Sequence, residues 1–481
     1  MKHASFTYCF CLALFVFGVL LQSGCATYGP EAEALRKTWT AGYATEAAKI
    51  AAKRVTEVEG SKNELIWRLE EGTALRAAGR FVASTEAFDK AEALIHRFDQ
   101  EADIKLSKEG IALITHLANL PYKGRYYDRI MISVYKALNA LQEGEIKKAR
   151  AALNRAYYSQ REALRANAKR IERAEEEAQK ESEKSNGFNL VGIQNSEQVQ
   201  SQLGERLQQT LQLATYADYV NPFAVYLDGL YFMYHAADQS DFERSKKSLE
   251  RVQNMVSEAS KLIKEDLKRR KAILRSGSLK KPIVYVFFET GQAPTREEFR
   301  IDVPLFLISD DVPYFGATFP RLKIHNNYLG GLSITSSEDN RAYVTQTLCS
   351  IDQVVATEFK NAWPVVVTKT LLSSGTKALA SYAAKEIVER QAGELWGMLT
   401  QIGTSLAQAA INQADLRTWQ TLPKEFQVAA LPRPRDGQLQ LKTANGFFVE
   451  TVTLPEAEVS CVYARSFGPS TPLKVHTFSL K

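Results

Sequence analysis

The chain has 481 residues, of which 45% are hydrophobic and 24% are charged. These proportions are typical of a folded globular protein and exclude collagen, long disordered chains and membrane proteins with many spans. The 61 Lys and Arg residues against 55 Asp and Glu give a formal net charge of +6, which does not indicate a nucleic-acid-binding protein. At about 150 residues per domain, the length predicts two or three domains.

The first residues combine a basic start, a short apolar run over 10–21 and a pair of small residues before Cys25. This pattern predicts a secretory signal peptide over residues 1–24, because the run is shorter than the roughly 20 residues that span a bilayer. The segment 21–25 resembles the lipobox of bacterial lipoproteins, although Gln22 replaces the usual aliphatic residue. The resemblance implies lipidation of Cys25, a palmitate-type anchor, a tether over residues 25–30 and, with Ala26 next, an outer-membrane location facing the periplasm. A conventional signal peptide is the alternative.

Two cysteines outside the predicted signal peptide fall in the C-terminal part of the chain, Cys349 and Cys461. Disulfides persist outside the cytosol, so these two cysteines are candidates for a disulfide bond. Two buried free thiols are the alternative, and the sequence leaves both open.

Residues 31–275 are rich in strong helix formers and contain proline only at positions 121 and 222. The segment from Gly72 to Ala91 places small and aromatic residues as in a tetratricopeptide (TPR) repeat, and it resembles that repeat. Similar patterns recur over 137–156, more weakly over 240–252, and partly around Gly42. Stacked helix pairs of this kind bury a shared apolar face and leave a concave surface. A generic helical bundle is the alternative.

The second unit continues into a helix that becomes polar on nearly all sides after Tyr158. A return helix ends near residue 216, so we expect a protruding helical hairpin over about 158–216. Such a hairpin is either a partner-binding spike or a spacer, because a helix without a wide apolar stripe is solvated or pairs narrowly.

Aromatic residues gather in two loops of the helical region. Tyrosine and phenylalanine offer rigid contact surfaces, which makes these side chains candidates for binding, with core packing as the alternative. The candidates are Tyr122, Tyr126, Tyr127 and Phe223.

Residues 280–481 have a different composition and predict a mixed domain with a mainly antiparallel sheet. Helices over about 344–412 are expected to cover this sheet, and the Asn445-Gly446 pair predicts a β-hairpin. The predicted fold class is therefore multidomain α+β. The predicted strands are 282–289, 300–308, 318–324, 426–430, 438–443, 447–454, 459–465 and 474–479.

The whole arrangement resembles an uncharacterised family of bacterial envelope lipoproteins with TPR-like helices and a C-terminal mixed α/β domain. The resemblance implies this architecture and an envelope location, and it brings no known reaction. The segments that carry it are 77–81, 120–122, 221–223, 288–294 and 415–423.

No phosphate-binding loop, His-Glu-x-x-His zinc motif, Gly-x-Ser-x-Gly elbow or Cys-x-x-Cys pair occurs in the sequence. The six histidines are scattered, so we expect no catalytic residues, no metal site and no cofactor. Arg417 and Trp419 are the best surface candidates in the C-terminal domain, because both residue types are favoured binding anchors. A structural stack of the guanidinium on the indole is the alternative.

These observations favour a non-enzymatic, membrane-anchored lipoprotein that binds a protein partner through its helical repeats, as a scaffold or assembly factor of the cell envelope. A cell-wall or polysaccharide-binding lipoprotein is the alternative, and an enzyme of unknown type is a third hypothesis.

The lipobox-like segment makes one direct prediction. Mass spectrometry of the exported protein should find a mature chain that begins at Cys25 and carries acyl groups, since lipid anchors are attached at that residue. An unmodified amino terminus on the exported chain would contradict the lipoprotein hypothesis.

Overall fold

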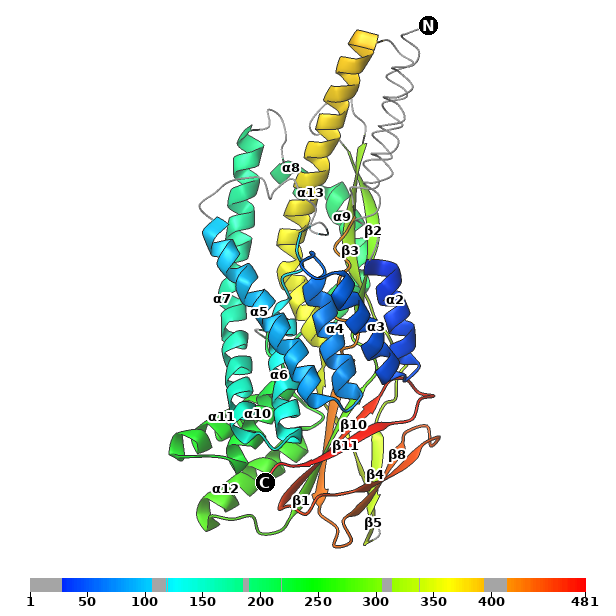
Figure 1. Cartoon of the computed structure of the whole chain (residues 1–481). Helices are drawn as coiled ribbons and strands as arrows, with labels where there is room; N and C mark the ends of the chain where they lie inside the picture. Colours follow the sequence, from blue (N-terminus) through cyan, green and yellow to red (C-terminus); the bar gives the residue numbers. More distant parts are fainter. Residues whose placement is uncertain are drawn as a thin grey trace.

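A computed structural model describes residues 28–105, 118, 120–184, 190–217, 219–304, 314–336, 338–392 and 413–481. The predicted signal peptide, Cys25 and the first residues of the tether lie outside these ranges, as do residues 393–412. The structure confirms the coarse fold class, a helical N-terminal region followed by antiparallel-rich sheets (Figure 1).

Helices make up the described chain as far as residue 276. The first described helix begins at Tyr28, so the last three residues of the predicted tether are helical. The helices are α2 (Tyr28–Thr40), α3 (Ala44–Glu57), α4 (Glu64–Ala77), α5 (Phe81–Lys105), α6 (Tyr126–Gln142), α7 (Ile146–Lys184), α8 (Leu190–Gln194), α9 (Glu197–Gln212), α10 (Pro222–Tyr234), α11 (Gln239–Met255) and α12 (Ser260–Ser276).

Three of the turns between these helices have the same geometry. Gly42, Gly79 and Gly144 all have positive φ, between 71° and 85°. Each glycine N–H bonds to the carbonyl three residues back, and the next N–H bonds to the carbonyl five residues back. This is the Schellman motif, which favours glycine because a side chain strains the left-handed conformation. The turn that the sequence pattern singled out therefore recurs after α2, α4 and α6.

A close contact between paired helices also recurs. The Ser84 hydroxyl on α5 donates to the Gly72 carbonyl on α4 at 2.7 Å, and Ser245 on α11 donates to Gly229 on α10 at 2.8 Å. A Cβ on Gly72 would lie 2.4 Å from the Phe88 ring, so the two helix backbones approach where no side chain fits.

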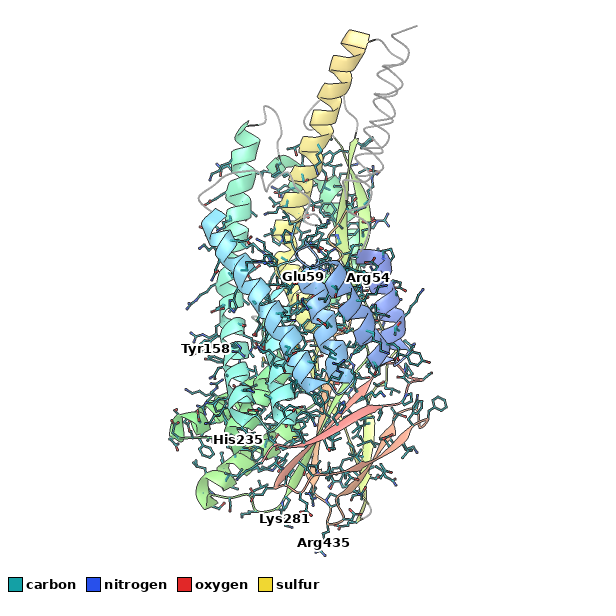
Figure 2. The ribbon with its side chains drawn as sticks, viewed as in Figure 1. Arg54, Glu59, Tyr158, His235, Lys281 and Arg435 are labelled. Carbon is teal, nitrogen blue, oxygen red and sulfur yellow. The ribbon has the colours of Figure 1, made fainter. Side chains whose placement is uncertain are left out.

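The predicted hairpin over 158–216 does not stand free. After Tyr158, which is exposed (Figure 2), α7 packs along the long helix α13 (Ile351–Ala392), and α8 and α9 contact the same helix. Asn167 on α7 donates to the Asn361 carbonyl of α13 at 3.3 Å. The polar helix therefore has a partner within the chain, which its own sequence did not reveal.

The remaining elements form three sheets. β1 (Ile283–Thr290) pairs in parallel with β10 (Val459–Ser466) and antiparallel with β7 (Glu425–Pro432), inside a five-stranded sheet of order β11-β10-β1-β7-β6. A four-stranded sheet has the order β5-β4-β8-β9, and β2 and β3 form a separate ribbon. The other strands are β2 (Thr295–Pro304), β3 (Tyr314–Lys323), β4 (Leu332–Ser336), β5 (Asp339–Val344), β6 (Gln346–Ser350), β8 (Gln438–Thr443), β9 (Val449–Thr453) and β11 (Lys474–Ser479).

Each predicted strand overlaps a strand of the structure, although residues 305–308 of the predicted strand 300–308 lie outside the described residues. The predicted hairpin joins β8 to β9 around Gly446. The sequence did not predict three of the strands, β4, β5 and β6. These strands are short, and two of them lack a clear alternation of apolar and polar residues. The prediction of helix from residue 344 was wrong at its start, since β6 ends at Ser350 and α13 begins after it. Pro364 lies inside α13, which continues on both sides of it.

The five-stranded sheet is the middle of three layers. Alternate side chains of a strand point to opposite faces, and β1 is buried on both. Val284, Val286 and Phe288 pack against the four-stranded sheet, whereas Tyr285 and Phe287 belong to the core under the helices. Figure 1 shows this sheet between the helices and the outer strands β4, β5 and β8.

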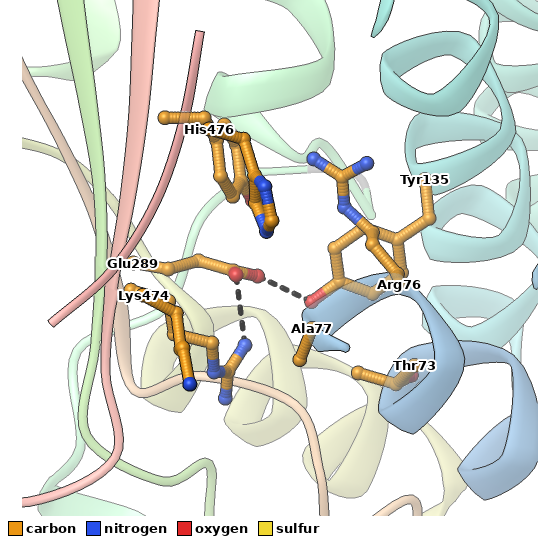
Figure 3. A pocket seen from close by; sticks show the side chains of 9 residues that line it. Thr73, Arg76, Ala77, Tyr135, Glu289, Lys474 and His476 are labelled. Atoms are coloured by element: carbon orange, nitrogen blue, oxygen red, sulfur yellow. Dashed lines mark hydrogen bonds and ion pairs between the residues drawn. The ribbon is translucent and has the colours of Figure 1, made fainter. Parts of the chain in front are cut away.

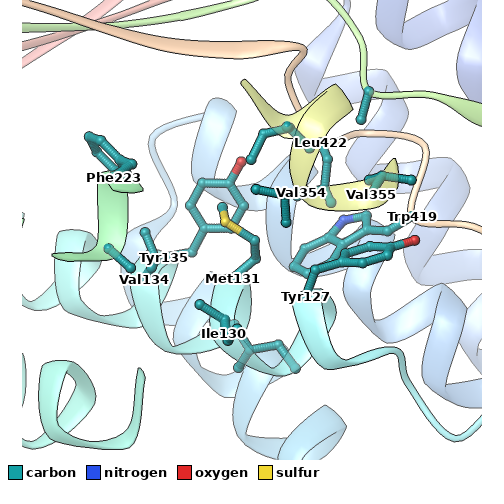
Figure 4. Close-up of a cluster of buried hydrophobic side chains, with 14 of the residues drawn as sticks. Tyr127, Ile130, Met131, Val134, Tyr135, Phe223, Val354, Val355, Trp419 and Leu422 are labelled. Carbon is teal, nitrogen blue, oxygen red and sulfur yellow. The ribbon is translucent and has the colours of Figure 1, made fainter. Parts of the chain in front are cut away.

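The helices and the central sheet share one hydrophobic core, which runs from Leu35 to Leu480. Phe223 on α10 stacks on Phe426 of β7 with ring centroids 4.1 Å apart. Figure 4 shows α6, α10 and α13 residues in one cluster with Trp419 and Leu422. The change of composition near residues 275–280 therefore marks the change from helices to strands and does not divide the core.

Cys349 and Cys461 do not form a disulfide bond. They lie on β6 and β10, which are three strand positions apart in the sheet, or about 14 Å at the usual strand spacing. A disulfide needs Cα atoms within about 7 Å, so the free-thiol alternative is correct. Burial raises the pKa of the Cys349 thiol to about 12, which keeps it protonated.

Among the described residues, no helix has both the length and the apolarity to cross a membrane.

The close helix contact at Gly72 predicts the effect of one methyl group. Gly72→Ala should lower the free energy of unfolding by about 1–3 kcal/mol, because the added carbon overlaps the Phe88 ring. Gly204→Ala in α9 is the matched control, since a Cβ at that position would have nothing within 4 Å and alanine favours helix by about 1 kcal/mol. Urea unfolding of both variants tests this; equal stabilities would contradict the proposed contact.

Candidate functional site

The aromatic binding candidates are mostly structural residues. Tyr122 and Tyr127 are buried near the start of α6, and Phe223 is buried under the sheet. The Tyr122 hydroxyl donates to Asp128 at 2.5 Å, and burial together with this carboxylate raises the pKa of Tyr122 well above its usual value. Tyr126 is half-buried and packs edge-on against the Tyr219 ring, with centroids 5.4 Å apart. The core-packing alternative therefore describes these loops.

Arg417 and Trp419 are also buried, so their prediction as surface anchors is wrong. Arg417 donates to the Leu120 carbonyl at 2.9 Å and lies over the Tyr122 ring, 5.5 Å from its centroid. The Trp419 indole N–H donates to Thr73 on α4 at 2.9 Å. Both residues thus fasten the segment before β7 to the helical region.

A buried carboxylate also contributes to this seam, the contact between α4 and the segment before β7. Glu70 on α4 accepts hydrogen bonds from the Gln420 and Thr421 backbone and from the Thr421 hydroxyl, at 2.6, 3.1 and 2.7 Å. Burial raises the pKa of Glu70 to about 7, and these hydrogen bonds oppose the shift. The Glu70 carboxylate therefore connects α4 to the segment before β7 through hydrogen bonds.

A large hollow lies on the surface of the helical region. It is a groove of about 260 Å³ along α3, α4 and α5, which lie side by side in Figure 1. Its floor consists of small apolar side chains, because alanines occupy the positions where these helices meet. The floor residues are Ala48, Ala52, Leu75, Ala78, Ala83 and Ala87. A floor of alanines leaves room for the backbone of a bound segment.

The rim of this groove carries an excess of positive charge. The lining includes four cations and two carboxylates, which gives a net charge of +2: Lys49, Arg68, Arg80 and Lys90 against Glu71 and Glu86. Arg68 is paired with Glu71 at 3.3 Å and with Glu64 at 3.6 Å. In contrast, Lys49, Arg80 and Lys90 are exposed and make no ion pair among the described residues. The groove therefore offers three free cations around an apolar floor.

No pattern recognised in the sequence indicated this groove. The repeat pattern predicted a concave helical surface, but it placed binding candidates on aromatic loops and not on alanines and lysines. The alternation of Ala and Lys along α3 was a usable signal, since Ala47 and Ala48 are buried and Lys49 is exposed.

No group of three or more His, Cys, Asp and Glu side chains among the described residues is arranged to hold a metal ion. No protein-family model, curated protein or solved structure matches the chain.

Proposed function

We propose that the chain is a lipid-anchored scaffold protein of the cell envelope that binds an acidic segment of a partner protein in the α3–α5 groove. The observation that carries this proposal is the groove itself, a floor of alanines flanked by Lys49, Arg80 and Lys90. An extended segment with small side chains and carboxylates complements it, because backbone approaches alanine closely and exposed cations attract carboxylates.

The repeated helix contacts support TPR-like stacking. The Schellman turns after α2, α4 and α6 and the serine–glycine contacts of α4–α5 and α10–α11 are what a repeated helix pair requires. Such stacks present extended surfaces that bind peptides, which agrees with the position of the groove across consecutive helices.

The envelope location rests on the N-terminal sequence. The apolar run and Cys25 lie outside the described residues, and α2 begins three residues after Cys25. A lipid on Cys25 would hold the groove near the membrane surface, because each buried acyl CH₂ contributes about 0.8 kcal/mol.

Charge reversal on the rim tests the proposal. A photo-crosslinking residue in place of Ala83 should capture one partner through an acidic segment, identified by mass spectrometry of the cross-linked peptides. Lys49→Glu with Lys90→Glu should lower the yield by about tenfold, since each exposed ion pair contributes up to about 1 kcal/mol and reversal adds repulsion.

The matched control reverses Lys247 on α11 and Lys264 on α12, which are exposed and outside the groove. This variant should cross-link as the parent does. Equal loss in both variants, or cross-links to segments without acidic residues, would contradict the proposed function. Point variants are preferred to removal of residues 31–275, because the helices and the sheet share a core.

A further inference from the structure

A second, smaller pocket lies between the helices and the central sheet. It is closed by α4 and α6 on one side and by β1, β10 and β11 on the other (Figure 3). Its volume is about 10 Å³, which is room for the centre of one water-sized particle. Its lining includes four charged side chains, and their charges are not balanced.

One ion pair in the pocket is complete. The Glu289 carboxylate lies 2.8 Å from the Arg465 guanidinium and accepts a hydrogen bond from the Tyr135 hydroxyl at 2.5 Å. All three residues are buried, so the carboxylate is fully engaged by these two partners. Glu289 is the only carboxylate among the described residues that line the pocket.

Arg76 has no such partner. The residue is 5% exposed, and its guanidinium forms no ion pair among the described residues. It donates to the Asn139 amide oxygen at 2.6 Å and lies over the Tyr463 ring, 4.5 Å from the centroid. An arginine stays charged in proteins, and a buried charge without a counter-ion is unfavourable. The exposed Lys474 at the pocket edge adds a further positive charge.

Several donors in the pocket also have no acceptor. The Nε atoms of Arg76 and Arg465 and the Tyr463 hydroxyl are buried without a hydrogen-bond acceptor in the described structure. Burial, with Arg76 and Lys474 nearby, lowers the pKa of His476 to about 4, so its ring is neutral at pH 7, and this ring also forms a hydrogen bond with the Ala77 backbone. In Figure 3 the His476 ring and the Arg76 guanidinium lie next to each other, on the same side of the Glu289 carboxylate.

We infer that the pocket binds a small inorganic anion of the size of chloride, as the counter-ion of Arg76 between α4 and the sheet. The excess of two positive charges and the unpaired donors select an anion, and the volume excludes larger oxyanions such as sulfate. This site is separate from the groove, which opens on the outer side of α4 and shares none of its lining residues.

The test compares anions at equal ionic strength. The purified chain is melted in sodium gluconate and then with increasing chloride or bromide. Both halides should raise Tm along a saturable curve, because an anion that binds only the folded chain stabilises it. Crystals grown in bromide should show an anomalous peak beside Arg76. A water molecule there, or an equal rise of Tm in gluconate, overturns the inference.

Two variants in the pocket and one surface control assign the effect to the pocket. Arg76→Met should abolish the halide dependence of Tm, whereas Arg251→Met on the exposed surface of α11 should keep it. Tyr463→Phe retains the ring over Arg76 and removes only the hydroxyl, so it should weaken bromide binding even if Arg76→Met does not fold. Unchanged bromide binding in Tyr463→Phe and in folded Arg76→Met contradicts the assignment.

Discussion

The helix-facing side of the central sheet is the constraint on which the rest of the structure depends. β1 places Tyr285, Phe287 and Glu289 on this side, and none of them is exposed by more than 2%. Burying one large apolar side chain contributes about 1.5–3 kcal/mol, but a buried carboxylate is favourable only when it is paired. Tyr135 from α6 and Arg465 from β10 supply the partners of Glu289. This side of the sheet therefore depends on the helices to bury its apolar side chains and to provide a hydrogen-bond donor to Glu289.

This dependence has a consequence for function. The groove lies on the outer side of α3, α4 and α5, while the inner side of α4 provides Glu70, Thr73 and Arg76 to the seam with the sheet. One helix that lines the proposed partner site, α4, is thus fixed in position by its contacts with the sheet and with the segment before β7. A rigid surface binds with less loss of conformational entropy than a mobile one, which suits a scaffold.

Much of the fold could be predicted from local sequence. The glycines at 42, 79 and 144 identify the helix turns, because positive φ favours glycine, and the alternating apolar runs identify most strands. Long-range pairing could not be predicted. Neither Arg417 nor Trp419 carries a local signal that it is buried, since its partners Leu120 and Thr73 lie about 300 residues away in the sequence. The packing of α7 along α13 is likewise a long-range contact, since Asn167 and Asn361 are 194 positions apart in the sequence.

The candidate sites show the same limit. Aromatic residues attract attention in a sequence, but here they fill the core, whereas the groove is made of alanines and lysines that are individually ordinary. The proposed anion pocket depends on the absence of a carboxylate partner for Arg76 among the described residues. No sequence pattern predicts which charged side chains remain unpaired after folding. Pairing of Cys349 with Cys461 was excluded by strand order, which is a property of the whole sheet.

Hydrogen exchange measured by mass spectrometry at increasing denaturant tests the central claim, that helices and sheet form one cooperative unit. Peptides from α4 and α6 should lose protection at the same denaturant concentration as peptides from β1 and β10, because they share one core. If the helical peptides exchanged at a clearly lower concentration while β1 and β10 stayed protected, the two regions would be independent and the claim would be wrong.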